Sequence, residues 1–528
     1  MNPDNTNFRN FAETGTYVDK SMLIDVLNTQ CIVNPELKFV CVSRPRRFGK
    51  SLAGGMLSAF YSKGADSKDL FAPFKVFGTE SFEKHLNKYN VVAIDLNALY
   101  SRRLSLGSKQ ETSIIGYVTN CVCDEFRREF SEIDFGNDNS LAGFMQTVYE
   151  QKKETFVIII DEYDVLVREK VSEQDFKIYL AFLNSLFKNW ELKPAITLAY
   201  ITGILPIIKD RIQSKLNTFH EYTMLDASPF AEFVGFTAQE VEQLCNKYGI
   251  SYEECKSWYD GYNLGGYEIY NPQAVYNAML SKKFKSYWSK TSSYTVVAEK
   301  IRMNFKGTKD DVIAMLGGGR VRVNVGMYEN TVESFTNKDD VFTYLIHLGY
   351  LAYDEEEGEC YIPNREIHEE WQKAIKNNED YSETDKIISA SRDLLDATLR
   401  GNEEIVAKAL DEAHYHVTSN LSYNNEKSLQ SAIYLAYIYA INKYIVVKEM
   451  PAGKGYADIV YIPFDKTKPA VIVELKRNGS TDSALCQIKE KRYFECLDNW
   501  HGDILFVGVN YDENSKKHEC KITEFAKD

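Results

Sequence analysis

Short apolar or β-branched runs alternate with longer amphipathic segments through the first half of this chain. The apolar runs predict strands, and the segments of helical periodicity between them, among them 50–61 and 174–188, predict helices. The predicted strands are 39–43, 91–96, 156–160, 196–201 and 221–225. This alternation is typical of a parallel sheet covered by helices, so we expect an α/β fold.

From Thr237 onward the pattern becomes mostly helical and predicts a smaller helical domain, with turns at Gly261, Gly265, Gly266 and Gly317 to Gly319. The charged run 365–386 contains only scattered apolar residues, which predicts a solvated helix leading to a domain boundary. Beyond it we expect a helix over 428–441 and a compact α/β unit with strands 444–449, 457–462, 471–476 and 504–509 and a helix over 483–496. We therefore divide the chain into residues 1–235, 236–385 and 386–528.

Length and composition restrict the class of protein. A chain of 528 residues, 44% hydrophobic and 26% charged, is that of a globular protein, with room for roughly three to four domains. The longest apolar run, 432–441, is about half of the ~20 residues that cross a bilayer, and the chain does not start like a signal peptide. We expect a cytoplasmic protein without a membrane partner. Ten cysteines without paired spacings predict reduced thiols rather than a disulfide framework or a zinc site.

The net charge of −14 is unevenly spread along the chain. Residues 421–528 hold 15 Lys plus Arg and 15 Asp plus Glu, so the whole deficit lies in the first 420 residues. Binding of a polyanion rests on Lys and Arg that neutralise phosphates. The C-terminal segment is therefore the better place for nucleic acid.

The segment from Arg44 to Ser51, with the sequence RPRRFGKS, joins the predicted strand 39–43 to the predicted helix 50–61. A P-loop has this order because backbone N–H groups at a helix N-terminus cradle phosphates, a lysine reaches the outer phosphates and a hydroxyl binds magnesium. We expect Gly49 and Lys50 to bind phosphate, Ser51 to bind magnesium, and the arginines at 44, 46 and 47 (Arg46 and Arg47 foremost) to bind phosphate oxygens.

Arg44 stands where the motif has its first glycine. A strand–turn–helix with a solvated basic corner is therefore the alternative to a nucleotide site.

Two further strand ends complete the predicted nucleotide site. Strand 156–160 runs into Asp161 and Glu162, where an acid can hold magnesium through its water shell and a neighbouring glutamate can polarise the attacking water. Strand 196–201 runs into Thr202, whose hydroxyl can sense the terminal phosphate. A strand that ends in Asp-Glu is by itself usually structural, but together with Lys50 and Ser51 it favours ATP and Mg²⁺ as ligands.

A second group of charged residues lies on the predicted hairpin of strands 457–462 and 471–476. With the turn centred near residue 466, Asp458 and Glu474 face each other about 5 Å apart, where like charges repel unless a cation lies between them. Lys476 falls on the face of Glu474 and can stabilise a metal-bound hydroxide or a pentavalent phosphate. The pattern predicts metal-dependent phosphodiester hydrolysis, with Mg²⁺ or Mn²⁺ held by Asp458 and Glu474.

Solvated charges on a surface hairpin are the alternative. They are disfavoured because the run 471–473 has the composition of a buried strand, where charges are costly unless paired or metal-bound. Glu426 could add another carboxylate, and Gln487 could orient or contact the nucleic-acid backbone. His414 and His416 are weak metal-ligand candidates, because an i, i+2 pair shares a face only on a strand and 403–413 predicts a helix.

With both sites placed, the chain resembles the bacterial family in which an AAA-ATPase-like domain is fused to a C-terminal PD-(D/E)XK nuclease domain. The resemblance extends over nearly the whole chain and rests on the combination of segments 17–21, 44–51, 161–164, 201–203, 235–237, 259–262, 270–272, 363–364, 453–458, 474–476 and 487–488. It implies that the missing first glycine is a habit of the family, that Asp458 and Glu474 bind the metal, and that Glu426 matches a helical glutamate of such nucleases. Ala457 stands where the nuclease motif often has a proline.

The resemblance implies a P-loop NTPase-type parallel sheet with a helical subdomain, followed by a restriction-endonuclease-like α/β domain. We expect an ATPase coupled to Mg²⁺- or Mn²⁺-dependent hydrolysis of DNA. One alternative is an ATP-dependent regulatory switch or scaffold whose nuclease fold only binds, and another is a nuclease whose P-loop domain never turns over. Assembly into a homo-oligomer, the choice between DNA and RNA, and the choice between ends and interior stay open at the level of sequence.

Overall fold

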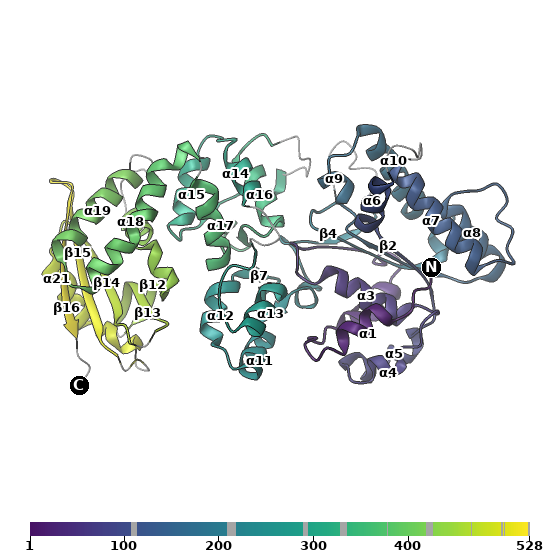
Figure 1. Ribbon diagram of the computed structural model, residues 1–528, viewed down its shortest axis with the longest axis horizontal. Helices are drawn as coiled ribbons and strands as arrows, with labels where there is room; N and C mark the ends of the chain where they lie inside the picture. Colours follow the sequence, from purple (N-terminus) through teal and green to yellow (C-terminus); the bar gives the residue numbers. More distant parts are fainter. Residues whose placement is uncertain are drawn as a thin grey trace. The chain divides into compact units, whose positions relative to one another are not determined.

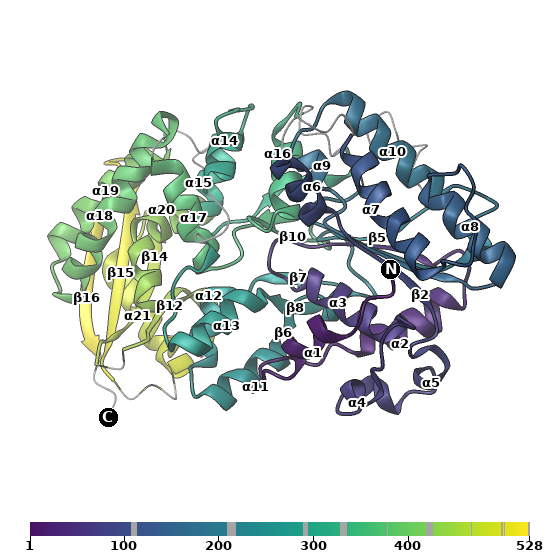
Figure 2. The same cartoon turned by 45° about the vertical axis from the view of Figure 1, so that its right-hand side comes forward.

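The computed structural model of the protein describes residues 1–106, 113–207, 218–288, 294–327, 335–376, 378–418, 426–452, 454–465, 467–497, 500 and 502–525 (Figures 1 and 2). The chain divides into two compact units. The first comprises residues 1–247, 261–276 and 324–356, and the second comprises residues 248–260, 277–323 and 357–528. The division into three domains at 235/236 and 385/386 stays a prediction.

A five-stranded parallel sheet forms the centre of the first unit. Its order is β2 (Asn90–Asp95), β3 (Phe156–Asp161), β4 (Ile196–Gly203), β1 (Phe39–Ser43) and β5 (His220–Tyr222). Each neighbouring pair is parallel, and every residue of β1 is buried. The carboxyl ends of β1, β4 and β3 therefore meet side by side at one edge. The predicted parallel α/β fold is confirmed.

Helices cover both faces of this sheet. Figures 1 and 2 show α7 (Ile114–Glu129) and α10 (Glu173–Phe187) on one face and α3 (Lys50–Tyr61) on the other. Together with α8 (Leu141–Lys152), the first two bury aromatic and aliphatic side chains against β2, β3 and β4 in one core. Serine hydroxyls at positions 113, 140 and 172 accept backbone N–H groups at the starts of α7, α8 and α10. These caps fix where the helices begin.

Smaller elements complete the first unit. Helices α1 (Thr6–Ala12), α2 (Met22–Val26) and α6 (Leu96–Ser105) lie in its N-terminal part, and α11 (Ala238–Tyr248) and α16 (Lys338–His347) in its later segments. The strands β6 (Phe236–Thr237), β8 (Tyr267–Tyr270) and β7 (Tyr262–Leu264) form a small antiparallel sheet. Gly265 and Gly266 turn β7 into β8 with positive φ angles of 56° and 84°, which glycine adopts without strain.

The second unit combines helices with a mixed sheet. Its helices include α12 (Tyr252–Tyr259), α14 (Thr295–Ile301), α15 (Thr308–Leu316), α17 (Arg365–Lys376), α18 (Ser382–Leu399), α19 (Glu403–Thr418) and α20 (Glu426–Ala436). The sheet has the order β12 (Tyr444–Ala452), β13 (Gly455–Pro463), β14 (Ala470–Arg477), β15 (Ile504–Asp512) and β16 (Lys517–Phe525). Only β14 and β15 run parallel, and α21 (Thr481–Glu490) makes the crossover between them. Leu485 and Ile488 of α21 share a core with Val460 and Ile472.

Two expectations about the second unit are corrected. The charged run 365–386 is not a solvated helix, because Arg365, Glu366 and Glu370 of α17 are all buried. The backbone N–H groups of Tyr287 and Trp288 donate to Glu366 Oε1, at 2.6 and 2.8 Å. These two tertiary donors satisfy Oε1 of Glu366, which would otherwise need water. The second correction is an additional strand, since β16 pairs along its length with β15 although its alternating polar sequence gave no strand signal.

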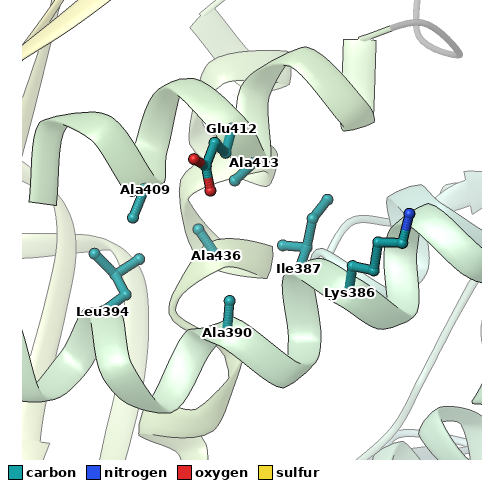
Figure 3. A pocket seen from close by; sticks show the side chains of 8 residues that line it. All are labelled: Lys386, Ile387, Ala390, Leu394, Ala409, Glu412, Ala413 and Ala436. Carbon is teal, nitrogen blue, oxygen red and sulfur yellow. The ribbon is translucent and has the colours of Figure 1, made fainter. Parts of the chain in front are cut away.

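A cavity of about 230 Å³ lies between α18, α19 and the end of α20. Figure 3 shows that the small side chains of Ala390, Ala409, Ala413 and Ala436 line this space and do not fill it. Lys386 and Glu412 also line it. The residues that line it include none of the predicted site residues. The cavity is therefore a feature of the helical packing, separate from the two candidate sites. In the described part of the chain, no helix combines the length and apolarity needed to span a membrane.

Candidate nucleotide and nuclease sites

The loop between β1 and α3 wraps around the side chain of Lys50. Gly49 adopts a left-handed φ of 94° immediately before the helix, a conformation that favours glycine. Lys50 is only 5% exposed, and its ammonium donates to the backbone carbonyls of Arg44 and Pro45, at 2.9 and 2.8 Å. Burial lowers the pKa of Lys50 to about 8, against the opposing effect of the nearby carboxylates Glu162, Asp164 and Asp161. A buried ammonium thus lies within the loop and close to the acidic strand end.

Arg44 differs from the expectation that it would suit phosphate or solvent. Its side chain is fully buried, and Nη1 donates to the carbonyls of Ser43, Tyr222 and Thr223 at 2.8, 3.0 and 3.0 Å. Burial lowers the pKa of Arg44 to about 10. Arg44 therefore ties the start of the loop to the end of β5.

The remaining loop residues face outward to different degrees. Arg46 and Ser51 are exposed, and Arg47 is half-buried with a positive φ of 72°. They lie on the same loop and first helical turn as Lys50. The outer side of the loop is therefore accessible to a ligand.

Asp161 and Thr202 are brought together by the pairing of β3 with β4. The Thr202 hydroxyl and the backbone N–H of Glu162 both donate to Asp161 Oδ1, the latter at 3.0 Å. Gly203 follows, and a Cβ there would lie 2.5 Å from Tyr163 Cε1 and 2.8 Å from Asp164 Oδ1. The Thr202-Gly203 step thus allows the two strand ends to approach closely.

Two residues at this edge were missed as site residues by the sequence analysis. Asp164 is buried, and its Oδ2 accepts the backbone N–H groups of Ile204 and Leu205 at 3.1 and 3.0 Å. Arg168 forms ion pairs with both Glu162 and Asp164. The i, i+4 spacing of Asp164 and Arg168 is typical of a helical ion pair and could have identified this partner from sequence.

The hairpin β13–β14 has the predicted register, with Ile459 opposite Val473. One step further along the same register, Asp458 falls opposite Glu474. The backbone N–H of Leu475 donates to Asp458 Oδ2 at 2.7 Å. Lys476 Nζ donates to Glu474 Oε1 at 2.9 Å and to Gln487 Oε1 at 2.6 Å. Strand pairing and helix α21 therefore assemble these four predicted side chains on one face.

Glu474 is the most constrained of these side chains. It is 2% exposed, and its Oε2 is buried without a hydrogen-bond partner among the described residues. Burial raises the pKa of Glu474 to about 7, the adjacent Asp458 acts in the same direction, and Lys476 opposes them. A buried carboxylate oxygen of this kind is costly unless a cation or donor reaches it.

Of the two predicted accessory residues of the nuclease site, the structure describes the side chain of Gln487 but not that of Glu426. Gln487 lies between Lys476 and Tyr493, because its Nε2 donates to the Tyr493 hydroxyl at 3.0 Å. Tyr493 was not identified from sequence. Glu426 is the first residue of α20, but its side chain lies outside the described part of the structure.

His414 packs inside the domain. It contacts His518 (Nδ1 to Nε2, 3.1 Å), which in turn bonds Asp411 Oδ1 at 2.9 Å. Burial lowers the pKa of His414 to about 4. The side chain of His416 is not described. Within the described residues, no three His, Cys, Asp or Glu side chains are close enough together to form a metal cluster.

The donor set at Asp458 and Glu474 fits a hard divalent cation. Carboxylate oxygens are the ligands that Mg²⁺ and Mn²⁺ prefer, and magnesium usually keeps several waters and takes few protein carboxylates. The unpartnered Oε2 of Glu474 supplies an oxygen that such an ion would satisfy. Asp458 and Glu474 would hold the ion, and Lys476 would stay beside it.

The fold and these two groups of side chains define a P-loop-type α/β domain joined to a nuclease-type α/β domain. Residues 5–213 match the family described as predicted AAA-ATPase, and residues 424–521 match the PD-(D/E)XK nuclease superfamily. The chain therefore combines a match to the predicted AAA-ATPase family in its N-terminal part with a match to the PD-(D/E)XK nuclease superfamily in its C-terminal part, the two domains that its sequence resemblance indicated.

More distant similarities were found in two comparisons. An uncharacterized protein in the vnfD 5′ region of Azotobacter chroococcum is 23% identical over 272 residues, which cover 49% of this chain and 48% of that protein. The chain thus spans about half the length of this curated relative. Two structures of the ORC2 protein of Aeropyrum pernix, in ADPNP–ADP complexes and in the ADP form, share 11% identity and have TM-scores of 0.22 and 0.24. They cover 69% and 68% of this chain and 94% and 92% of their own, and similarity at this level supports no functional conclusion.

Proposed function

We propose that the protein binds and hydrolyses ATP with Mg²⁺ and couples this cycle to metal-dependent hydrolysis of DNA. The observation that carries the proposal is the pairing of the buried Glu474 with the half-buried Asp458, with Lys476 bonded to Glu474 and one oxygen of Glu474 left without a partner among the described residues. Such an arrangement costs stability in a purely structural hairpin, and it is useful where a cation and a phosphate must be bound.

In the nucleotide site, Gly49, Lys50, Arg46 and Arg47 would bind the phosphates. Two ammonium hydrogens of Lys50 are directed at backbone carbonyls, so the third can donate to a phosphate oxygen. Ser51 and Asp161 would hold Mg²⁺ with its waters. The hydroxyl of Thr202, which donates to Asp161, would sense whether the terminal phosphate is present.

Glu162 would orient the attacking water. The oxygen of that water bonds to the γ-phosphorus as the bond to the bridging oxygen breaks, and its proton passes to solvent or phosphate.

In the nuclease site, Asp458 and Glu474 would bind Mg²⁺ or Mn²⁺, which supplies a nucleophile from bound water and stabilises charge on phosphate. Lys476 is held by Glu474 and Gln487, so its ammonium has a fixed direction. It can neutralise charge that develops on the phosphate as water adds to phosphorus and one ester bond breaks. The departing alcohol oxygen takes up a proton.

DNA as the substrate, a cytoplasmic location and assembly into a homo-oligomer belong to the same proposal. The balanced charge of residues 421–528 supports the C-terminal domain as the DNA-binding part, because the rest of the acidic chain repels phosphates. Three exposed basic residues follow Gln487 and can contact a nucleic-acid backbone. They are Lys489 in α21, and Lys491 and Arg492 directly after it.

The test is cleavage of linear, circular and single-stranded DNA with Mg²⁺ or Mn²⁺, with and without ATP. Wild type is compared with Glu474→Ala, with Lys50→Ala and with the control Glu519→Ala, an exposed glutamate on β16. We expect Glu474→Ala to abolish cleavage, Lys50→Ala to lose cleavage as well because ATP can no longer drive it, and Glu519→Ala to behave as wild type. If Lys50→Ala cleaves DNA at the rate of wild type, the protein is a nuclease whose P-loop domain is structural. No cleavage by wild type in any condition would favour an ATP-dependent switch or scaffold.

A further inference from the structure

Arg168 joins two carboxylates at the acidic end of β3. It is the last residue of the short helix α9 (Val165–Arg168). Its Nη2 forms an ion pair with Glu162 Oε2, and its Nε lies 3.1 Å from Asp164 Oδ2, an ion pair without hydrogen-bond geometry. The side chains of Arg168, Glu162 and Asp164 are 12%, 22% and 2% exposed, so water screens these contacts only partly.

The second of these carboxylates is itself fixed to the neighbouring strand. Asp164 Oδ2 accepts the backbone N–H groups of Ile204 and Leu205, which directly follow β4. The backbone N–H of Tyr163 donates to the carbonyl of Thr202 at 2.9 Å. Arg168 is thereby anchored, through Asp164, to the strand end that carries Thr202.

Glu162 is constrained from its backbone as well. It has a positive φ of 56°, uncommon for a residue with a side chain, and its N–H donates to Asp161 Oδ1. The direction in which its side chain leaves the strand is therefore set by the backbone, and the position of its carboxylate is set by Arg168.

Charge balance is consistent with this arrangement. Burial alone would lower the pKa of Arg168, but Asp164 and Glu162 outweigh burial and raise it. The guanidinium therefore stays charged, and it also acts electrostatically on Lys50 of the P-loop. A lysine at this position would keep the charge but could not present a planar fork to two carboxylates.

We propose that Arg168 is a positioning residue for ATP hydrolysis, which holds the Glu162 carboxylate in the direction needed to orient the attacking water. The inference rests on the proposed ATPase function. Arg168 would act through Glu162, with which it forms an ion pair, so its effect is expected on the catalytic step and not on nucleotide binding. Misplacement of a catalytic group by about 1 Å costs up to about a hundredfold in rate.

The test measures kcat and KM for ATP hydrolysis, and the Kd of a fluorescent ATP analogue, in the full-length protein. The variants are Arg168→Lys, Glu162→Gln and the double variant. The control is Arg9→Lys, which alters the exposed i, i+4 ion pair with Glu13. We expect Arg168→Lys to lower kcat by about tenfold to a hundredfold with Kd unchanged. The double variant should match Glu162→Gln alone, because residues that act as a unit are not additive.

Each other outcome is informative. An unchanged or raised kcat in Arg168→Lys overturns the inference, because the arginine would then be structural or a brake on Glu162. A Kd raised more than tenfold overturns it by making Arg168 a nucleotide contact, and additive losses in the double variant show a role independent of Glu162. If wild type itself hydrolyses no ATP, the proposed ATPase function fails and this inference fails with it.

Discussion

Gly203 shows how a single residue controls the edge of the sheet where β3 and β4 end. It follows Thr202 in β4, and a Cβ there would lie 2.5 Å from Tyr163 Cε1 and 2.8 Å from Asp164 Oδ1. Both neighbours are buried, and Asp164 cannot move without disturbing the hydrogen bonds that the backbone N–H groups of Ile204 and Leu205 donate to its Oδ2. Only a residue without a side chain lets the β3 and β4 ends meet here.

We therefore expect Gly203→Ala to lower the free energy of unfolding by about 1–3 kcal/mol, the usual cost of overpacking. Urea denaturation is the measurement, and ATP hydrolysis should fall with it because Asp164 shifts. Gly55→Ala in α3 is the matched control, since nothing lies within 4 Å of its added methyl group. Equal midpoints for the two variants would show that the β3–β4 edge accommodates the methyl group.

Tyr493 has a comparable role in the nuclease domain. Its hydroxyl accepts from Gln487 Nε2, which leaves Gln487 Oε1 to accept from Lys476. Gly455 allows this approach, because a Cβ there would already lie 3.2 Å from the Tyr493 hydroxyl. The tyrosine thereby fixes which end of the Gln487 amide faces the lysine.

We expect Tyr493→Phe to lower the rate of DNA cleavage by about tenfold, because Gln487 can then turn its amide and release Lys476. Steady-state cleavage at saturating Mg²⁺ measures this. Tyr456→Phe removes a hydroxyl from an exposed tyrosine on the same sheet and serves as the control. A rate for Tyr493→Phe equal to that of this control would contradict the positioning role.

At the scale of elements, α17 is the segment whose charge pattern misled the sequence analysis. Arg365, Glu366 and Glu370 are buried among groups that lie far away in the chain, and the Arg365 guanidinium lies over the rings of Trp258 and Phe464, at 4.1 and 4.9 Å. Burial raises the pKa of Glu366 to about 8, against the two backbone N–H groups that lower it. A charged helix is here part of the interior.

Glu366 therefore makes stability depend on pH. The folded-state pKa is above that of an unfolded glutamate, so its contribution is fully present below about pH 4.5 and is lost as the pH rises through about 8. Glu366→Gln keeps an acceptor for Tyr287 and Trp288, and we expect its unfolding free energy to exceed that of wild type increasingly across this window, by up to about 1.4 kcal/mol per pH unit. Urea midpoints at pH 6, 7 and 8 measure the difference. Glu253→Gln, at an exposed position of α12, controls for the loss of one charge, and parallel profiles for Glu366→Gln and wild type would contradict the prediction.

At the scale of the whole molecule, the two candidate sites belong to different compact units. Glu162 lies in the first and Glu474 in the second, so their side chains can be altered separately.

We expect Glu474→Ala to retain ATP hydrolysis within about twofold of wild type while DNA cleavage is lost, because the two sites belong to different compact units and share no residues. Glu162→Gln should bind ATP, fail to hydrolyse it and lose ATP-stimulated cleavage. Parallel assays of phosphate release and DNA cleavage on the same samples measure both. Full cleavage by Glu162→Gln would mean that ATP binding, without turnover, is sufficient for coupling.

The sequence alone determined the elements that carry strong local signals. Strand β1 and helix α3 have the predicted bounds, and the register of β13 with β14 follows from the hydrophobic alternation and the turn between them. Helix ends were less accurate, since the segment predicted as a helix over 428–441 gives way to a 3₁₀ turn at Ile438–Asn442. Strand ends that carry Asp161, Thr202 and Glu474 were visible because a buried run stopped at a polar residue.

Only the tertiary structure decided which distant groups satisfy one another. Such contacts bury Arg44 against the end of β5 and join Arg168 to Glu162 and Asp164. They also link Tyr493 through Gln487 to Lys476 and bury the charges of α17. Local sequence fixes periodicity and strand ends because these depend on neighbouring side chains. Whether a charge faces solvent or a partner depends on chain segments that packing brings together. The sequence could therefore predict the two candidate sites but not the residues that hold their side chains in position.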